Sequence, residues 1–204
     1  MTCIAVTQRV EVVQAYGERR DALDQRWQQF LHRCELLPLL CPNHSGNRQR
    51  LLDTVPVAGA LLTSGNTLAA YGGDAPERDA AERHLLEFCI ARRLPVIGVC
   101  RGMQSIQHFF GVALRHVHGH VASEQQIAIN GKTETVNSYH DWGTTETTPD
   151  LAVWAIAEDG LVKAVRHRRL PVIGIMWHPE RIAGFRRADL ALFRDAFAAH
   201  TVPE

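Results

Sequence analysis

The sequence lacks a net charge, a long apolar segment and any closely spaced pair of cysteines. Its 22 basic and 22 acidic side chains cancel, so composition provides no large field that would attract a nucleic acid or an anionic membrane. No uninterrupted apolar run has the length of a membrane span. The apolar run after Met1 is too short for a signal peptide. We therefore expect a cytoplasmic protein that binds neither nucleic acid nor a membrane.

Cysteine is present, but its pattern does not indicate disulfides or a metal site. The five cysteines are an odd number, form no Cys-x-x-Cys pair and show no metal-ligand spacing. This usage is typical of a reducing compartment, in which thiols stay free for chemistry. The chain also lacks internal repeats and linkers, and its 204 residues favour a single domain over residues 1–204.

Strand-like and helix-like segments alternate through most of the chain. Buried strands are predicted from apolar or β-branched runs at residues 3–7, 36–42, 58–63, 95–99 and 171–177. With helices between them, including a last one at 188–200, this alternation predicts an α/β fold with a central, mostly parallel sheet. The segments 151–156 and 161–165 flank Glu158-Asp159-Gly160, which predicts a small antiparallel hairpin.

One strand-to-helix junction carries a cysteine between small residues. The strand at 95–99 passes through Gly98-x-Cys100-x-Gly102 into a helical segment that ends before Gly111. Small residues on both sides of a nucleophile permit a sharp, strained turn, because a Cβ at either position would collide with neighbouring backbone. A helix N-terminus also favours the thiolate. Cys100 is therefore predicted to be a nucleophile, and a buried core cysteine is the alternative.

A second predicted strand ends in His178-Pro179-Glu180. Because the carboxyl ends of parallel strands lie at one edge of a sheet, His178 and Cys100 are expected to meet there. In an extended backbone Glu180 falls on the same side as His178, and Pro179 between them fixes φ. A thiol nucleophile needs a base, and the base needs an orienting partner. The sequence thus predicts a Cys100–His178–Glu180 triad.

Two backbone amides are candidates for an oxyanion hole. Acyl transfer to a thiol passes through an oxyanion, which needs two N–H donors. The Arg101 amide directly follows the nucleophile, and the Gly65 amide lies in a small-residue loop after a neighbouring strand. We expect these two groups to stabilise the oxyanion.

Residues 112–150 contain an unusual alternation of histidines. His116, His118 and His120 would share one face of an extended strand, at a spacing compatible with zinc. No Cys, Asp or Glu ligand accompanies them, and alternating polar residues are also typical of a solvent-facing strand. The sequence therefore predicts no metal site and leaves their role open. The polar segment 121–150 is expected to form covering strands and loops, and whether it acts as a mobile lid is also open.

Residues 10–33 carry large apolar side chains at helical spacing beneath a charged face, and a helix is predicted there. The dense charges at 18–27 are typical of a solvated helix face with i,i+4 ion pairs. The alternative hypothesis places arginines over the mouth of the site to meet a phosphate or carboxylate. The candidates are Arg9, Arg20 and Arg26.

Two motifs, in this order, resemble those of the class I (triad) glutamine amidotransferase family along nearly the whole chain. The motifs are Gly98-Val99-Cys100-Arg101-Gly102-Met103-Gln104 and Trp177-His178-Pro179-Glu180. The resemblance implies a flavodoxin-like α/β domain, hydrolysis of a γ-amide, and no metal or organic cofactor. It matches residues 62–66 to an oxyanion loop that is usually richer in glycine, with Ser64 at one such position. It also implies which groups hold the α-amino and α-carboxylate groups of a glutamyl substrate: the side chain of Gln104 and the backbone around Tyr139, His140, Asp141 and Trp142.

Further segments resemble particular branches of that family. Arg78-Asp79-x-x-Glu82 is similar to free-standing γ-glutamyl hydrolases such as the γ-glutamyl-GABA hydrolases. The segments 7–9, 20–27 and 175–181 are more similar to γ-glutamyl-CDP-amidate hydrolases, which release glutamate and cytidine diphosphoramidate during capsule phosphoramidate synthesis. A diphosphate leaving group suits guanidinium partners.

The expected partner is therefore a small γ-glutamyl amide substrate. A γ-glutamyl-CDP-amidate is the leading expectation. A γ-glutamyl-GABA-type hydrolase, or a glutaminase subunit that supplies ammonia to a separate synthase, is the alternative. The sequence leaves the oligomeric state open, with a homodimer among the options.

Overall fold

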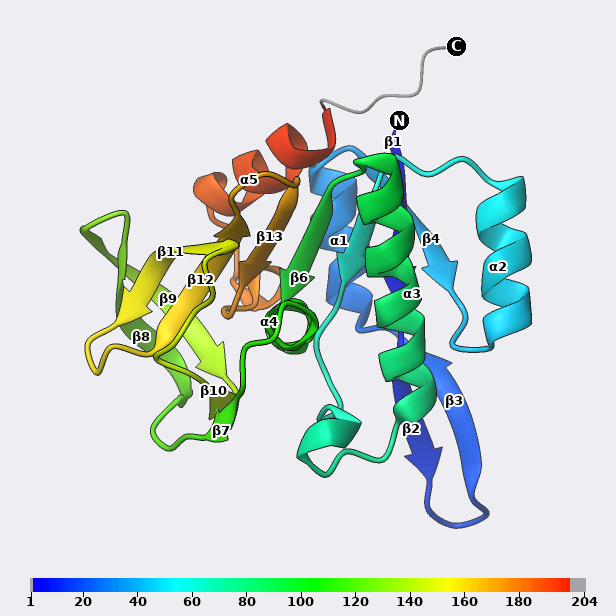
Figure 1. Ribbon diagram of the computed structural model, residues 1–204, viewed down its shortest axis with the longest axis horizontal. Helices are drawn as coiled ribbons and strands as arrows, with labels where there is room; N and C mark the ends of the chain where they lie inside the picture. The colour runs from blue at the N-terminus through cyan, green and yellow to red at the C-terminus, as the bar shows by residue number, and fades with distance from the viewer. Residues whose placement is uncertain (1, 199–204) are drawn as a thin grey trace.

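A nine-stranded mixed sheet forms the centre of the computed structural model, which describes residues 2–198 (Figure 1). Its parallel part consists, in spatial order, of β4 (Leu36–Cys41), β1 (Thr2–Thr7), β5 (Ala60–Leu62), β6 (Val96–Val99) and β13 (Val172–Ile175). The antiparallel part continues with β12 (Val162–His167), β11 (Leu151–Ala157), β8 (Val121–Ile129) and β9 (Lys132–Tyr139). The predicted α/β class is confirmed, and the antiparallel part extends beyond the one predicted hairpin.

Helices cover both faces of the parallel strands. On one face lie α1 (Gln25–Arg33) and α5 (Arg187–Ala198), and on the other lie α2 (Ser45–Thr54), α3 (Pro76–Arg92) and α4 (Arg101–Phe109). Two short 3₁₀ helices, η1 (Ala69–Tyr71) and η2 (Pro179–Arg181), follow β5 and β13. The last two positions of the helix predicted at 188–200 lie outside the described residues.

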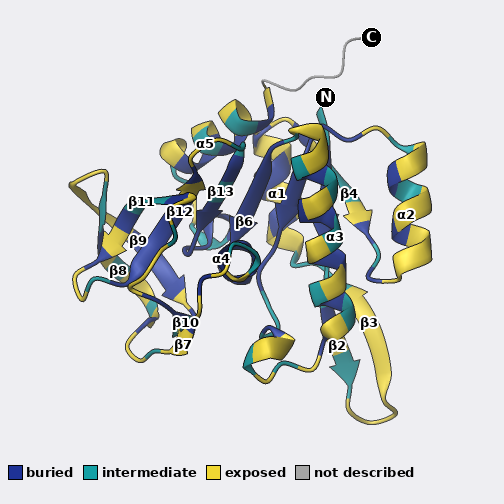
Figure 2. Ribbon diagram, viewed as in Figure 1, coloured by how far each residue is buried: buried dark blue, intermediate teal, exposed yellow. Residues whose placement is uncertain are grey.

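The strands are apolar on both sides because both sides are covered. In β1, Ile4 and Val6 belong to the same core cluster as Trp27 of α1, whereas Ala5 between them belongs to a second cluster, with Leu85 of α3. Because successive side chains of a strand point to opposite faces, they enter different layers of the core. Figure 2 shows the result: the central strands β5 and β6 are buried along their length, whereas the edge strand β4 exposes Leu37 and Leu40. The carboxyl edge of the parallel sheet can therefore hold reactive groups at fixed positions.

The helix predicted over residues 10–33 is wrong in its first half. Arg9–Val13 (β2) and Glu18–Ala22 (β3) form an antiparallel hairpin, and only Gln25–Arg33 is helical. Asp24 begins α1, because its side chain accepts a hydrogen bond from the Arg26 amide at 3.0 Å. The side chain of Asn66 pairs with both the N–H and the C=O of Val10, which anchors β2. This long-range partner overrides the helical spacing.

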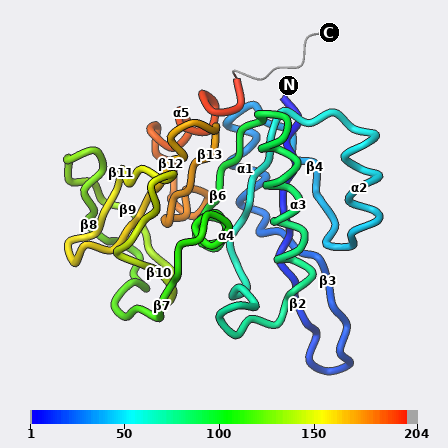
Figure 3. The backbone as a smooth tube through the Cα atoms, viewed as in Figure 1, coloured from blue at the N-terminus to red at the C-terminus, as the bar shows by residue number. Residues whose placement is uncertain are grey.

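The β2–β3 hairpin leaves the body of the protein at the carboxyl end of β1, as Figure 3 shows. A second two-stranded sheet pairs β7 (Arg115–His116) with β10 (Trp142–Gly143). Both small sheets lie on the side of the molecule at which the parallel strands end (Figure 1). Among residues 2–198, no helix combines the length and the apolar character that crossing a membrane requires.

Candidate active site

Cys100 lies on a strained turn between β6 and α4. Its backbone has φ +52° and ψ −104°, a conformation that non-glycine residues rarely adopt. A Cβ on Gly98 would lie 2.5 Å from the backbone of Gly102, and a Cβ on Gly102 would lie 2.1 Å from the carbonyl oxygen of Leu62. Both glycines are therefore required by close backbone approach. This packing holds Cys100 at the head of the helix.

His178 and Glu180 follow β13, the strand beside β6. The His178 Nδ1 and Glu180 Oε1 atoms are 2.9 Å apart, and both side chains are almost fully buried. Because Nδ1 contacts Glu180, the other ring nitrogen, Nε2, is free to interact with the Cys100 thiol. Burial alone would lower the pKa of His178, but the neighbouring Cys100 and Glu180 outweigh it and raise the pKa to about 9. The arrangement suits a thiolate–imidazolium pair.

Asn137 of β9 fixes the backbone of His178, a role the sequence does not indicate by itself. Its side-chain amide donates to the His178 carbonyl at 2.9 Å and accepts from the His178 N–H at 2.7 Å. Asn137 is buried, so the N–H and C=O groups of its side-chain amide would have no hydrogen-bond partners without this pairing. The only signal in the sequence is its position at the start of the polar segment 137–143.

A pocket of about 330 Å³ opens beside Cys100. The structure brings together most of the predicted site residues there. The lining residues are Gly65, Asn66, Thr67, Cys100, Arg101, Gln104, His116, Tyr139, His140, Asp141 and Trp142. The Gln104 side chain donates to the Trp142 carbonyl at 2.9 Å, which ties α4 to the segment 139–142. The thiol of Cys100 lies 3.8 Å from the Tyr139 carbonyl oxygen.

The two candidate oxyanion donors both lie at this pocket. Gly65 has φ +89°, so the loop after β5 uses a conformation that favours glycine. Arg101 is the first residue of α4, where an N–H has no partner within the helix. The Arg101 side chain turns away into the interior and forms ion pairs with Asp79 and Glu82 of α3. Only its backbone is therefore left to serve the pocket.

The three candidate phosphate-binding arginines do not gather at this pocket. Arg9 comes nearest, because a Cβ added to Gly65 would lie 3.0 Å from the Arg9 side chain. Arg20 pairs with Glu18 on its own hairpin strand and is half exposed. Arg26 lies 3.6 Å from the Asp24 carboxylate and is also half exposed. None of the three is among the lining residues.

The alternating histidines do not share one face. The strand β7 ends at His116, whose ring is 4.8 Å from that of the exposed His118. His120 is buried and stacks on His140, with ring centroids 5.1 Å apart. Within the described part of the chain, no group of three or more His, Cys, Asp or Glu side chains could hold a metal ion. The extended zinc-like arrangement is therefore absent from residues 2–198.

A buried lysine lies behind the pocket wall and was not predicted. Lys163 Nζ lies 2.7 Å from His140 Nε2, 3.0 Å from His120 Nδ1 and 3.0 Å from the Ser138 hydroxyl. Burial lowers the pKa of Lys163 to about 8. Burial and the Lys163 charge also lower the pKa of His140 to about 3, so that imidazole stays neutral. The network supports the segment that follows β9.

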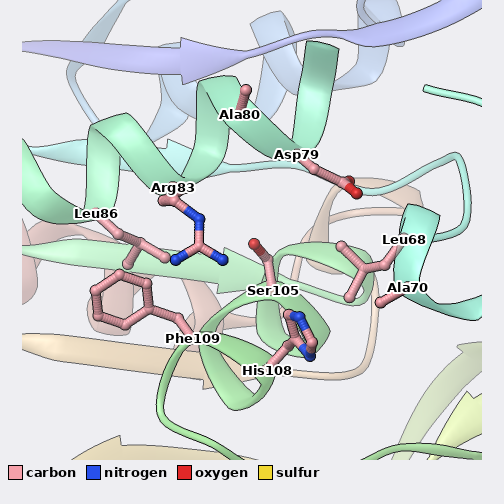
Figure 4. Close-up of a pocket in the computed structure, with 9 residues that line it drawn as sticks. All are labelled: Leu68, Ala70, Asp79, Ala80, Arg83, Leu86, Ser105, His108 and Phe109. Carbon is pink, nitrogen blue, oxygen red and sulfur yellow. The ribbon is translucent and has the colours of Figure 1, made fainter. Parts of the chain in front are cut away.

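A second cavity, of about 250 Å³, lies between α3, α4 and η1 (Figure 4). Arg83 from α3 and Ser105 and His108 from α4 are among its polar lining residues. Cys100 does not line it. It is therefore separate from the pocket at the carboxyl edge of the sheet.

Two protein families match the chain. The family Glutamine amidotransferase class-I matches residues 72–198, and the family Peptidase C26 matches residues 2–128. Together they support a hydrolase that acts on C–N amide bonds.

Individual proteins are similar over much of their length. The γ-glutamyl-CDP-amidate hydrolase of Campylobacter jejuni subsp. jejuni serotype O:2 is 26% identical over 92% of this chain and 94% of its own. Anthranilate synthase component 2 of Mycobacterium tuberculosis is 31% identical over 65% of this chain and 61% of its own. Among solved structures, a Thermoplasma acidophilum protein described as part of a GMP synthase has a TM-score of 0.72 at 16% identity. That match covers 97% of this chain and 93% of the other.

Proposed function

The chain belongs to the class I glutamine amidotransferase family, and from this premise we propose that it hydrolyses γ-glutamyl amides with a Cys100–His178–Glu180 triad. The observation that carries the proposal is the buried His178–Glu180 contact of 2.9 Å beside a cysteine on a strained helix N-terminus. A nucleophile, a base and an orienting carboxylate are the groups that acyl transfer to a thiol requires.

The proposed reaction begins with attack of the Cys100 thiolate on the γ-carbonyl carbon of the substrate. The resulting oxyanion accepts hydrogen bonds from the Gly65 and Arg101 amides. The His178 imidazolium, favoured by a pKa of about 9, donates its proton to the departing nitrogen, and the C–N bond breaks. Neutral His178 then takes a proton from water, which attacks the γ-glutamyl thioester. Collapse of this second intermediate releases glutamate and restores the thiolate–imidazolium pair.

The pocket wall supplies the groups for the glutamyl end of the substrate. In the proposal, the Gln104 side chain and the backbone around Tyr139, His140, Asp141 and Trp142 hold the α-amino and α-carboxylate groups. The contact between Gln104 and the Trp142 carbonyl supports this role, because it orders both parts before substrate binds. A free amino acid end explains why the pocket is polar.

For the leaving group, we propose a nucleoside diphosphate, so that the substrate is a γ-glutamyl-CDP-amidate and the product cytidine diphosphoramidate for capsular polysaccharide modification. Similarity to the Campylobacter jejuni hydrolase over 92% of the chain supports this choice. The position of Arg9 beside Gly65 supports it as well, because a guanidinium there can meet a phosphate on the leaving-group side.

Glutamate release from a panel of substrates tests the proposal. The panel contains γ-glutamyl-CDP-amidate, γ-glutamyl-GABA and glutamine, each with the wild type and with Cys100→Ala. We expect the highest kcat/KM for the CDP-amidate and no measurable turnover for Cys100→Ala. A preference for γ-glutamyl-GABA would reject the nucleotide substrate and keep the mechanism. Full activity of Cys100→Ala would reject the mechanism.

A glutaminase subunit is the second candidate, and similarity to anthranilate synthase component 2 favours it. Such a protein passes ammonia to a separate synthase and depends on that partner for activity. It predicts slow glutamine hydrolysis by the isolated chain and strong stimulation when a co-purifying synthase is added. Equal rates with and without any co-purifying protein would exclude it.

A further inference from the structure

Three charged side chains are almost fully buried beside the pocket. Arg78 and Glu82 lie on successive turns of α3, and Arg101 begins α4. Their relative exposures are 0%, 0% and 1%. Removing charges from water costs several kcal/mol for each ion, and apolar residues of similar volume are often at least as stable in such places. Stability is therefore a weak reason for this cluster to exist.

The guanidinium of Arg78 holds the loop that follows β5. It donates to the carbonyl oxygens of Thr63 at 2.8 Å and Ser64 at 2.9 Å, and also to that of Gly65. Five donors in a planar fork suit arginine for such a set of acceptors. The loop 63–65 is thus fixed through its backbone, which contacts between its small side chains could not achieve.

The hydrogen bonds from Arg78 also set the direction of the Gly65 N–H. The Ser64 carbonyl and the Gly65 N–H belong to one planar trans peptide unit, in which C=O and N–H point in opposite directions. Because Arg78 binds the Ser64 carbonyl from the interior, the Gly65 N–H turns away from Arg78. Gly65 lines the pocket with Cys100, so the N–H is directed to the side on which the oxyanion forms.

Glu82 connects this loop to the nucleophile turn. One carboxylate oxygen lies 3.2 Å from Nε of Arg78, and the other forms an ion pair with Arg101. Arg101 carries the other candidate oxyanion amide and directly follows Cys100. A single side chain therefore contacts both arginines, one of which orients the Gly65 amide while the other contributes its own amide.

We propose that Glu82 is a positioning residue that sets the two halves of the oxyanion hole, Gly65 and Arg101, at a fixed separation. The inference rests on the proposed acyl-enzyme function, because only a reaction with an oxyanion needs both donors. Asp79 assists, since its carboxylate binds Arg101 and accepts a hydrogen bond from the Ala69 amide at 2.8 Å. Loss of Glu82 would leave the arginines facing each other without their shared counter-charge.

Glu82→Gln is the test, and Glu87→Gln on the exposed side of the same helix is the matched control. Two rates are measured for each protein. One is hydrolysis of a γ-glutamyl amide, which passes through an oxyanion. The other is alkylation of Cys100 by iodoacetamide, followed by mass spectrometry, which displaces iodide and forms no oxyanion. We expect kcat to fall about 10- to 100-fold in Glu82→Gln, with KM within about threefold and alkylation no slower than in the wild type.

Equal kcat values for Glu82→Gln and the wild type would overturn the positioning role. A parallel fall in hydrolysis and alkylation would also overturn it, since it would indicate general damage to the pocket. If Glu82→Gln does not fold, Asp79→Asn decides the matter, because Asp79 is partly exposed and its replacement is milder. We expect a smaller, about 3- to 10-fold fall in kcat with unchanged alkylation; no fall would reject the inference. A wild type that hydrolyses no γ-glutamyl amide would instead refute the proposed function itself.

Discussion

The buried side of the pocket, which carries Cys100, is held by neighbours on several elements, whereas the β2–β3 hairpin nearby keeps Arg9 and Arg20 exposed and paired within the hairpin. Cys100 and His178 follow two adjacent parallel strands, and Glu180 and Asn137 both bind His178. The β2–β3 hairpin pairs its own charges, Arg9 with Glu11 and Arg20 with Glu18.

The same residue type serves both sides with different consequences. Arg78 and Arg101 are buried, meet carboxylates and backbone carbonyls, and cannot change position without leaving charges unpaired. Arg9 and Arg20 are half exposed, and their ion pairs lie in water, where each contributes at most about 1 kcal/mol. The buried arginines are therefore held in one geometry, while the exposed arginines can exchange their ion pairs for contacts with a ligand.

The largest effect on kcat is expected for a substitution in the proposed triad, on the buried side of the pocket. Glu180→Gln keeps the shape of the side chain but removes the charge that orients and stabilises the His178 imidazolium. We expect kcat for γ-glutamyl amide hydrolysis to fall about 10²- to 10⁴-fold. Glu158→Gln, at an exposed position, serves as the control. If kcat falls less than about threefold in Glu180→Gln, the buried side of the pocket tolerates substitution as well as the exposed hairpin does.

Steric change on the same side tests whether the Cys100 turn is as tightly packed as its distances indicate. Gly102→Ala places a Cβ 2.1 Å from the Leu62 carbonyl oxygen, whereas a Cβ on Gly131 meets nothing within 4 Å. We expect Gly102→Ala to lower the free energy of unfolding by about 3 kcal/mol or more. Gly131→Ala, whose φ is +79°, should cost only about 1 kcal/mol of backbone strain. Denaturant titrations measure both, and equal costs would contradict the close packing.

The pKa of His178 tests the charge pair on the buried side of the pocket. His178 has a pKa of about 9 in the folded protein, against an ordinary value of about 6.5. Its contribution to stability is therefore fully present below pH 6.5 and is lost as the pH rises through 9. Burial opposes this rise in pKa, and the Cys100 thiolate is the largest group that favours it.

A Cys100 thiolate offsets this loss of stability, because the folded thiolate–imidazolium pair and the unfolded thiol–imidazole pair bind equal numbers of protons between about pH 6.5 and about pH 8.5. The direct measurement is therefore the pKa of the His178 ring, followed by NMR. Cys100→Ser removes the group that raises this pKa most, and we expect the pKa to fall from about 9 toward about 6.5. An unchanged pKa in the variant would show that His178 is not paired with a thiolate.

The smallest effects are expected on the exposed side. Arg9→Ala should raise KM for the CDP-amidate about 10-fold, because Arg9 lies against Gly65 and one charge-assisted contact is lost. Arg20→Ala and Arg26→Ala should change KM less than about twofold, since both arginines are half exposed and lie off the pocket. Hydrolysis of glutamine, whose leaving group carries no anion, is the internal control and should not respond to Arg9→Ala. Equal changes in KM for all three substitutions would contradict the proposal that only Arg9 contacts the leaving group.

Local patterns in the sequence predicted the parallel strands, the 151–165 hairpin and the setting of Cys100, because each depends on residues close together in the chain. Strand-to-helix turns with small flanking residues have few alternatives. The hairpin at 9–22 was missed because the pattern of apolar residues fits more than one period and because the Asn66 contact that anchors it comes from a distant loop. Asn137 and Lys163 were missed for the same reason: each acts through partners that only the fold brings near.

The sequence by itself determined the α/β class, the family and the strained cysteine turn, since strand period, glycine positions and motif order are local properties. Tertiary structure decided which charges are buried together and which remain in water. Glu82 and Glu87 are five residues apart on one helix, yet the first contacts Arg78 and Arg101 and the second faces solvent. Burial depends on what packs against each face of the helix, and the residues that pack there come from distant parts of the chain.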